Sequence, residues 1–228
     1  MTAPVKVNLL EADPDLGRYL ADDSVRALKG SLHADALDLP AGPWVPPRAA
    51  PEPGHLGYLI LGGMLVRRVM VAGARSGELL ARGDLIRPWV EDPVSFCDAD
   101  WRVIEPTRLA VLTRTVGVRL CARPELNAAV LDKQMERSRS LAISAATENV
   151  RGLDRRLLIL FWHLAERWGL RKGGEVIVPL HLTHETLSLL VGARRPSVTT
   201  ALSLLAGEGS VRRTADGWVL SGEPPAPA

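Results

Sequence analysis

The chain has 228 residues, 46% of them apolar, which is enough for one or two domains with their own cores. Its 28 basic and 26 acidic residues nearly cancel, and the mild basic excess of residues 151–228 (10 against 7) does not by itself identify a nucleic-acid binder. No apolar run approaches the roughly 18 residues of a membrane span, and the first residues lack a signal-peptide pattern. We therefore expect a soluble, cytoplasmic protein that does not contact membranes.

The type of secondary structure that the sequence predicts changes along the chain. Residues 13–30 read as one or two short helical turns. From about residue 37 to 122, short apolar runs alternate with glycine-containing turns, which is typical of an antiparallel sandwich or barrel. Residues 125–150 contain neither glycine nor proline and predict one long helix.

The long helix carries a stripe of apolar and small residues at heptad spacing. Small residues let two helices approach closely, and a buried asparagine can fix their register and oligomeric state. We interpret the helix as a homodimer seam, although it could instead pack on its own sandwich. The stripe consists of Leu131, Met135, Ser138, Ala142, Ala145 and Asn149.

Two short helices are predicted in the C-terminal third, after an amphipathic core helix over residues 153–168 and a strand over 175–180. Thr183 is a good N-cap for the first short helix, and Gly192 permits the positive-φ turn that a tight corner requires. Pro196 fits the first turn of the second helix. This is the length and turn chemistry of a helix-turn-helix.

The second short helix leaves polar residues facing outward near its N-terminal end. Arginines there can bond guanine, and hydroxyls can bond bases or phosphates. Residues 210–220 read as two short strands around Asp216-Gly217, a hairpin that would make the motif a winged helix. An ordinary helical hairpin for protein contacts is the alternative. The predicted DNA-binding residues are Thr183, His184, Arg194, Arg195, Pro196, Ser197, Thr199, Thr200, Arg212 and Arg213.

The stretch "PLHLTHETLSLLVGARRPSVTTALSLLAGEGSVRR", followed by "GWVL", resembles the DNA-binding half of the Crp/Fnr family of bacterial transcription regulators. "RGDLIRPW" followed by "WRVIEPTRLAVLT" is similar to the late strands of that family's cyclic-nucleotide-binding-type β-roll. The resemblance implies an α+β chain with an antiparallel, jelly-roll-like sensor domain over 1–123, a dimerisation helix over 124–151 and a winged helix over 152–228. It also implies a near-palindromic operator, and it places the family's base-reading positions on Arg194, Arg195, Pro196, Ser197 and Thr200.

The sensor departs from the family pattern. Nucleotide-binding members hold the ribose with a Gly-Glu pair, which aligns here with Arg87-Pro88, and the cyclic phosphate with an Arg-Ser/Thr pair, which aligns with Cys97-Asp98. A proline cannot accept a ribose hydroxyl, and an aspartate repels a phosphate. We therefore expect that the protein does not bind cyclic AMP in the family's usual way.

Other candidate sites have simpler interpretations. Cys97 and Cys121 lack metal-ligand spacing and could sense oxidation, but packing is the favoured interpretation. His33 or His55 could ligate haem in a redox- or haem-responsive regulator. The "HLTHE" stretch matches neither zinc-protease motif, so we expect no metal there.

No catalytic motif such as GxSxG is present, so we expect neither an enzyme nor a cofactor. Double-stranded DNA is the expected partner, RNA polymerase a candidate one, and a small-molecule effector is left unidentified. The roll could also be a ligand-free interaction platform with constitutive or partner-controlled DNA binding.

Overall fold

The computed structural model describes residues 5–89 and 96–225 and has an α+β fold. No helix in the described part of the chain is long and apolar enough to cross a membrane. The elements in chain order are β1 (Lys6–Asn8), α1 (Leu9–Ala12), η1 (Pro14–Gly17), α2 (Asp22–Lys29), β2 (His33–Leu39), β3 (Gly42–Trp44), β4 (Gly57–Val71), β5 (Ala74–Ala81), β6 (Leu85–Ile86), β7 (Cys97–Leu112), α3 (Arg114–Cys121), α4 (Pro124–Glu148), α5 (Leu153–Trp168), β8 (Leu170–Lys172), β9 (Glu175–Val178), α6 (His184–Leu190), α7 (Arg195–Gly207), β10 (Val211–Thr214) and β11 (Gly217–Leu220).

The described residues form two compact units. The first comprises the residues up to Gly73 together with Glu78–Arg139, and the second comprises Ala74–Gly77 and the residues from Ser140 onward. Helix α4 therefore begins in the first unit and ends in the second. The predicted division at residues 124 and 152 remains a proposal about domains, although both numbers fall at helix boundaries.

Two long strands, β4 and β7, are the centre of the seven-stranded sheet. The strand order is β1-β2-β7-β4-β5, with β3 paired to β7 and β6 paired to β4. The β4–β7 register shifts near Gly62, which marks a bulge. Gly63 has a φ of +85°, and a Cβ there would lie 2.2 Å from the Pro106 carbonyl oxygen. Only glycine fits this close approach.

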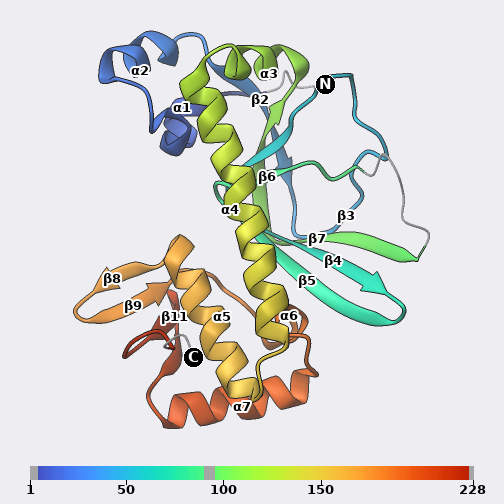
Figure 1. Cartoon of the computed structure of the whole chain (residues 1–228), viewed down its shortest axis with the longest axis vertical. Helices are drawn as coiled ribbons and strands as arrows, with labels where there is room; N and C mark the ends of the chain where they lie inside the picture. The colour runs from blue at the N-terminus through green and yellow to red at the C-terminus, as the bar shows by residue number, and fades with distance from the viewer. Residues whose placement is uncertain (1–4, 90–95, 226–228) are drawn as a thin grey trace. The chain divides into compact units, whose positions relative to one another are not determined.

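The sheet buries two hydrophobic clusters. One, which we call the aromatic cluster, contains Tyr58, Trp89 and Trp101, with Trp44 packed against it. Its rings meet edge to face, with centroids 5.7 Å apart for Trp44 and Trp101, an arrangement favoured by the ring quadrupoles. The other joins the sheet to the short helices, and α1, α2 and α3 gather at one end of the sheet (Figure 1).

Helix α4 is buried at its start and exposed along one face. Leu126, Ala129 and Val130 are buried, with Leu126 and Val130 part of the second cluster. The helix ends at Glu148, one residue earlier than the heptad pattern requires. Asn149 lies just past the end, where its side-chain amide donates to the Ala145 carbonyl (2.9 Å). The prediction that Asn149 belongs to the helix is therefore wrong, because the residue closes the helix instead.

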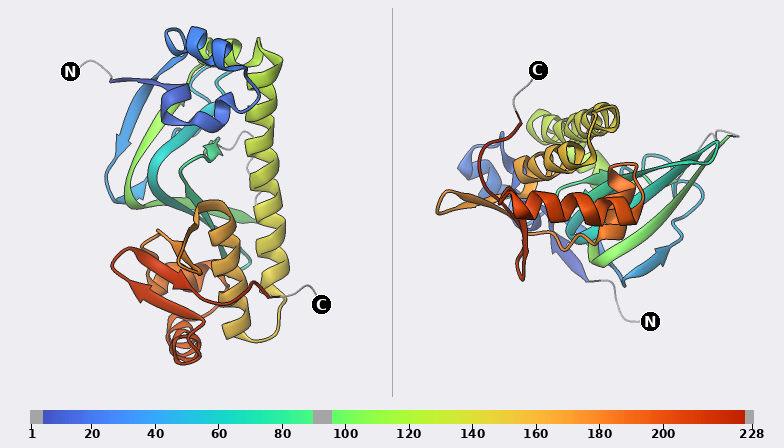
Figure 2. Two further views of the ribbon diagram at one scale, coloured as in Figure 1. Left: turned by 90° about the vertical axis from the view of Figure 1, so that its left-hand side faces the viewer. Right: turned by 90° about the horizontal axis from the view of Figure 1, so that it is seen from below.

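The second unit packs α5, α6 and α7 with a four-stranded sheet of order β10-β11-β9-β8. Its core includes Leu157 and Phe161 of α5 and Val198 of α7, all fully buried, and the Phe161 ring packs against Trp218 at a tilt of 42°, with ring centroids 4.9 Å apart. Helix α7 runs across one end of this unit (Figure 1) and is uncovered when seen from that side (Figure 2). Strand β8 was not predicted, since its three residues are all exposed and carry no apolar alternation.

Candidate nucleic-acid interface

Helix α6 begins where the sequence predicts. The Thr183 side chain is the N-cap and accepts the Thr186 backbone N–H (3.1 Å). Leu182 and Leu187 on either side of this cap are fully buried, as a hydrophobic staple requires. The start of α6 is therefore fixed by both polar and apolar contacts.

The corner between α6 and α7 is a Schellman-type turn. Gly192 has a φ of +61°, and the Ala193 N–H donates to the Ser188 carbonyl (2.9 Å) across it. A residue with a Cβ is strained at that φ. Pro196 lies in the first turn of α7, where backbone N–H groups lack partners within the helix. The corner thus aims the N-terminal end of α7 away from the core.

The two faces of α7 differ sharply in chemistry. Its inward face consists of buried Val198, Ala201, Leu202 and Leu205. Its N-cap and first two turns expose Arg194, Arg195, Pro196, Ser197, Thr199 and Thr200. Neither arginine pairs with a carboxylate among the residues that the structure describes. The exposed end of α7 is therefore a cationic, hydroxyl-rich surface at a helix N-terminus, which suits phosphate and guanine.

The two threonine hydroxyl groups in the first turns of α7 already have hydrogen-bond partners within the protein. The Thr199 hydroxyl donates to the Arg195 carbonyl (3.2 Å) and lies 2.9 Å from Nδ1 of His184, which links α6 to α7. The Thr200 hydroxyl donates to the Pro196 carbonyl (3.3 Å). The same outward face continues to Leu204, which is 58% exposed. The sequence analysis left Leu204 out, although it follows Thr200 at helical spacing.

The hairpin β10–β11 forms the predicted wing, and its two arginines differ. Nη2 of Arg212 lies 3.0 and 2.8 Å from the two carboxylate oxygens of Glu175, so its charge is compensated within the sheet. The guanidinium of Arg213 instead lies over the Trp218 ring, 5.9 Å from its centroid. Of the two, Arg213 is better placed to meet an external phosphate.

The predicted dimer stripe on α4 is an exposed face. Leu131 is 56% exposed and Met135 is 63% exposed. Ser138, Ala142 and Ala145 continue this face and are exposed too. We call these five residues the exposed stripe of α4.

The first of the two sensor pairs that depart from the family pattern, Arg87-Pro88, lies beside the aromatic cluster. Arg87 is exposed and stacks on Trp89, 5.4 Å from its ring centroid, while Pro88 and Trp89 are buried. His55 is also buried, and its Nδ1 accepts the Gly57 N–H (3.0 Å). Burial holds the pKa of His55 below its ordinary value, so the ring is a neutral acceptor here.

The remaining candidate residues are dispersed. Cys121 is exposed and Cys97 is half-buried, so the expectation that both pack in the core is wrong for Cys121. Nε2 of His181 lies 3.1 Å from the Ala215 carbonyl oxygen, at the wing. Within the described ranges, no group of three or more His, Cys, Asp or Glu residues could hold a metal ion.

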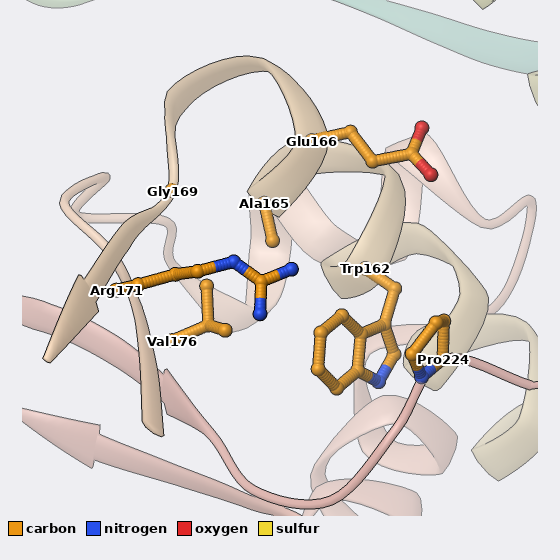
Figure 3. Close-up of a pocket in the computed structure, with 7 residues that line it drawn as sticks. All are labelled: Trp162, Ala165, Glu166, Gly169, Arg171, Val176 and Pro224. Carbon is orange, nitrogen blue, oxygen red and sulfur yellow. The ribbon is translucent and has the colours of Figure 1, made fainter. Parts of the chain in front are cut away.

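A small cavity of about 120 Å³ lies in the second unit, and none of the residues that line it belongs to α7 (Figure 3). The indole of Trp162 forms one wall, and Pro224 lies beside it. The lining offers no pair of groups suited to acid–base or nucleophilic chemistry. It consists of Trp162, Ala165, Glu166, Gly169, Arg171, Val176 and Pro224.

The comparisons with known proteins agree with this geometry. Residues 155–221 match the family model of the Crp-like helix-turn-helix domain. No curated protein matches the chain at a significant level.

Several solved structures share the fold over most of the chain. FixK2 from Bradyrhizobium japonicum is 14% identical, with a TM-score of 0.62 over 84% of this chain and 93% of its own. A transcriptional regulator of the CRP/FNR family from Thermus thermophilus is 19% identical (TM-score 0.56; 82% of this chain, 94% of its own). A cyclic nucleotide-binding domain containing protein from Listeria monocytogenes is 11% identical (TM-score 0.61; 82% and 89%). Residues 155–221 are therefore similar to a Crp-like helix-turn-helix domain, and most of the chain shares the fold of these solved structures.

Proposed function

We propose that the protein acts as a homodimer that reads a near-palindromic operator, with the N-terminal end of each α7 in the major groove. The observation that carries this proposal is the division of α7 into a buried apolar face and an exposed cationic face. In such a pair the two readers meet successive major grooves about one helical turn apart. Arg195 is the residue we assign to a guanine, because it is exposed in the first turn and free of a carboxylate partner in the described part of the chain.

The exposed stripe of α4 supports the dimer. Removing an apolar side chain such as Met135 from water is favourable, and pairing with a second copy would bury it. The small residues further along the stripe would let the two helices approach closely. The seam then ends near Ala145, because Asn149 is outside the helix.

We also propose that the roll does not hold cyclic AMP in the family's usual way. Pro88 offers no side-chain acceptor for a ribose hydroxyl, and Asp98 would place a carboxylate beside the phosphate. Arg87 occupies the other position of the pair that aligns with Gly-Glu, and its guanidinium lies over the Trp89 ring. We expect that millimolar cyclic AMP leaves the melting temperature unchanged, and a clear rise would contradict this part of the proposal.

The test is selection of bound sequences from a random duplex pool by the purified protein, without added ligand. Enrichment of a palindrome with half-sites about one helical turn apart is the expected result. The matched control is a variant with Arg194 and Arg195 both changed to alanine, which should enrich nothing. If the control enriches the same palindrome, another surface reads the DNA. If the wild type enriches nothing even when the selection is repeated in cell extract, the proposed function is wrong.

A further inference from the structure

The face of α4 that packs on the roll changes from apolar to charged after its first two turns. Lys133 Nζ lies 2.6 Å from the Asp13 carboxylate, and both side chains are about 95% buried. The Gln134 side-chain amide donates to the Leu85 carbonyl oxygen (3.2 Å). These contacts tie one turn of α4 to two separate segments of the first unit.

A buried carboxylate on β5 completes this set. Glu78, whose side chain is 8% exposed, accepts a two-pronged bond from Arg137 of α4, with Nε and Nη2 at 2.6 and 3.0 Å. Nε of Arg67 on β4 lies 3.0 Å from the same carboxylate. Arg137 is only 15% exposed, and it lies two residues before the end of the first unit at Arg139.

Stability alone does not account for a buried ion pair at this place. Desolvation of the two charges offsets most of their attraction, and well-packed apolar residues commonly give equal or greater stability. A forked guanidinium–carboxylate bond differs from an apolar contact in direction, since it admits one orientation of the two groups. The Glu78–Arg137 pair therefore fixes how α4 is rotated about its own axis.

That rotation decides which side chains α4 offers to a second copy. Successive residues turn by about 100° round a helix. Leu131, Met135 and Ser138 consequently share the exposed stripe, while Lys133 and Arg137 lie on the opposite side. A small rotation of α4 on the roll would move the stripe by the same angle.

We propose that Glu78 and Arg137 are positioning residues that set the rotation of α4 and, through the dimer seam, the half-site spacing that the regulator prefers. The inference rests on the proposed function, because it needs a dimer that reads two half-sites. In this proposal, the preferred spacing between half-sites depends on two side chains that contact neither the DNA nor the second copy of the chain.

The experiment measures affinity for duplexes that carry the two selected half-sites, with the spacing varied by one base pair at a time. The test variant is the double change Glu78→Leu and Arg137→Met, which removes the fork but keeps the site filled. The matched control is the double change Asp38→Ala and Arg108→Ala, which removes a forked pair of similar distances, 2.7 and 2.9 Å, that is more than half exposed on the same sheet.

We expect the wild type and the control to favour one spacing by about tenfold over its neighbours, and the test variant to bind all spacings within about threefold. A test variant with the wild-type profile overturns the inference but leaves the proposed function intact. A wild type without any preferred spacing overturns both. If the double variant does not fold, Arg137→Lys decides, because lysine keeps the charge and loses the fork: a flattened profile supports the inference and an unchanged profile refutes it.

Discussion

Two helices of this protein, α7 and α4, each leave one face exposed, and the two faces differ in chemistry: one is cationic and the other is apolar. The outward face of α7 begins with Arg194 and Arg195 and continues with hydroxyl-bearing residues. The exposed stripe of α4 presents Leu131 and Met135 followed by small side chains. A cationic face gains from a polyanion and an apolar face gains from another apolar surface, so each face indicates a different kind of partner.

The comparison predicts the largest effect for a charge placed on the apolar face. Met135→Asp should separate the copies and remove the second half-site, which lowers operator affinity by about 10²–10⁴-fold, as expected for the loss of bivalent binding. Sedimentation and operator titration measure the two effects together. Glu136→Gln, a polar change at the neighbouring position outside the stripe, should alter neither. A dimeric Met135→Asp variant would show that the seam lies elsewhere.

A smaller and more selective effect is expected at the cationic face. Arg195→Ala should cost roughly 1–3 kcal/mol on the selected operator and much less on random duplex, because a guanine contact is sequence-specific. Filter binding or fluorescence anisotropy on both duplexes measures the difference. Equal losses on the two duplexes would mean that Arg195 contacts only phosphate.

The wing offers a comparison between two arginines, because Arg212 forms an ion pair with Glu175 and Arg213 instead lies over the Trp218 ring. Arg213→Ala should weaken binding to all sequences and reduce the slope of log affinity against log salt by about 1, as expected for one lost phosphate contact. Arg212→Ala should change the slope less, since Arg212 is paired with Glu175. The reverse ranking would mean that the Arg212–Glu175 pair opens when DNA binds.

The smallest expected effect concerns two buried histidines in the interior and not the exposed faces of α7 and α4. Burial lowers the pKa of His55 in the first unit, and burial followed by the nearby Arg167 lowers the pKa of His163 in the second. The unfolded chain, with an ordinary histidine pKa of about 6.5, takes up protons first, so stability should fall as pH drops below that value. Melting temperatures at pH 7.5 and 5.5 measure the loss, and His55→Gln or His163→Gln should each reduce it. Equal melting temperatures at the two pH values would exclude a contribution from either ring.

The two short helices and the turn between them could be predicted from the sequence because their determinants are local. The Thr183 cap, Gly192 in its positive-φ turn and the inward stripe from Val198 to Leu205 all lie within two dozen residues of one another. The exposed face of α4 followed from heptad spacing in the same way. Both features are set by periodicity, which a single sequence displays.

The contacts that the sequence does not reveal are pairings between distant residues. Glu78 and Arg137 are charged and would be expected at the surface, yet each is buried because the other compensates it. The sequence analysis also did not anticipate the pairing of Arg212 with Glu175, which is 37 positions away in the chain. Asn149 fitted the heptad, but α4 ends at Glu148, and the Asn149 side-chain amide donates to the Ala145 carbonyl just past that end.

The strand pairing of the two units also bears on how the chain folds. In the first unit, β2 pairs with β7, so that Asp35 lies opposite Val111, whereas β10 and β11 of the second unit are joined by a tight turn. Distant pairings require large loops to close before any contact forms, and this slows folding. The first unit should therefore fold more slowly than the second, although it is made first. On the ribosome, its sheet cannot be completed until β7 has emerged.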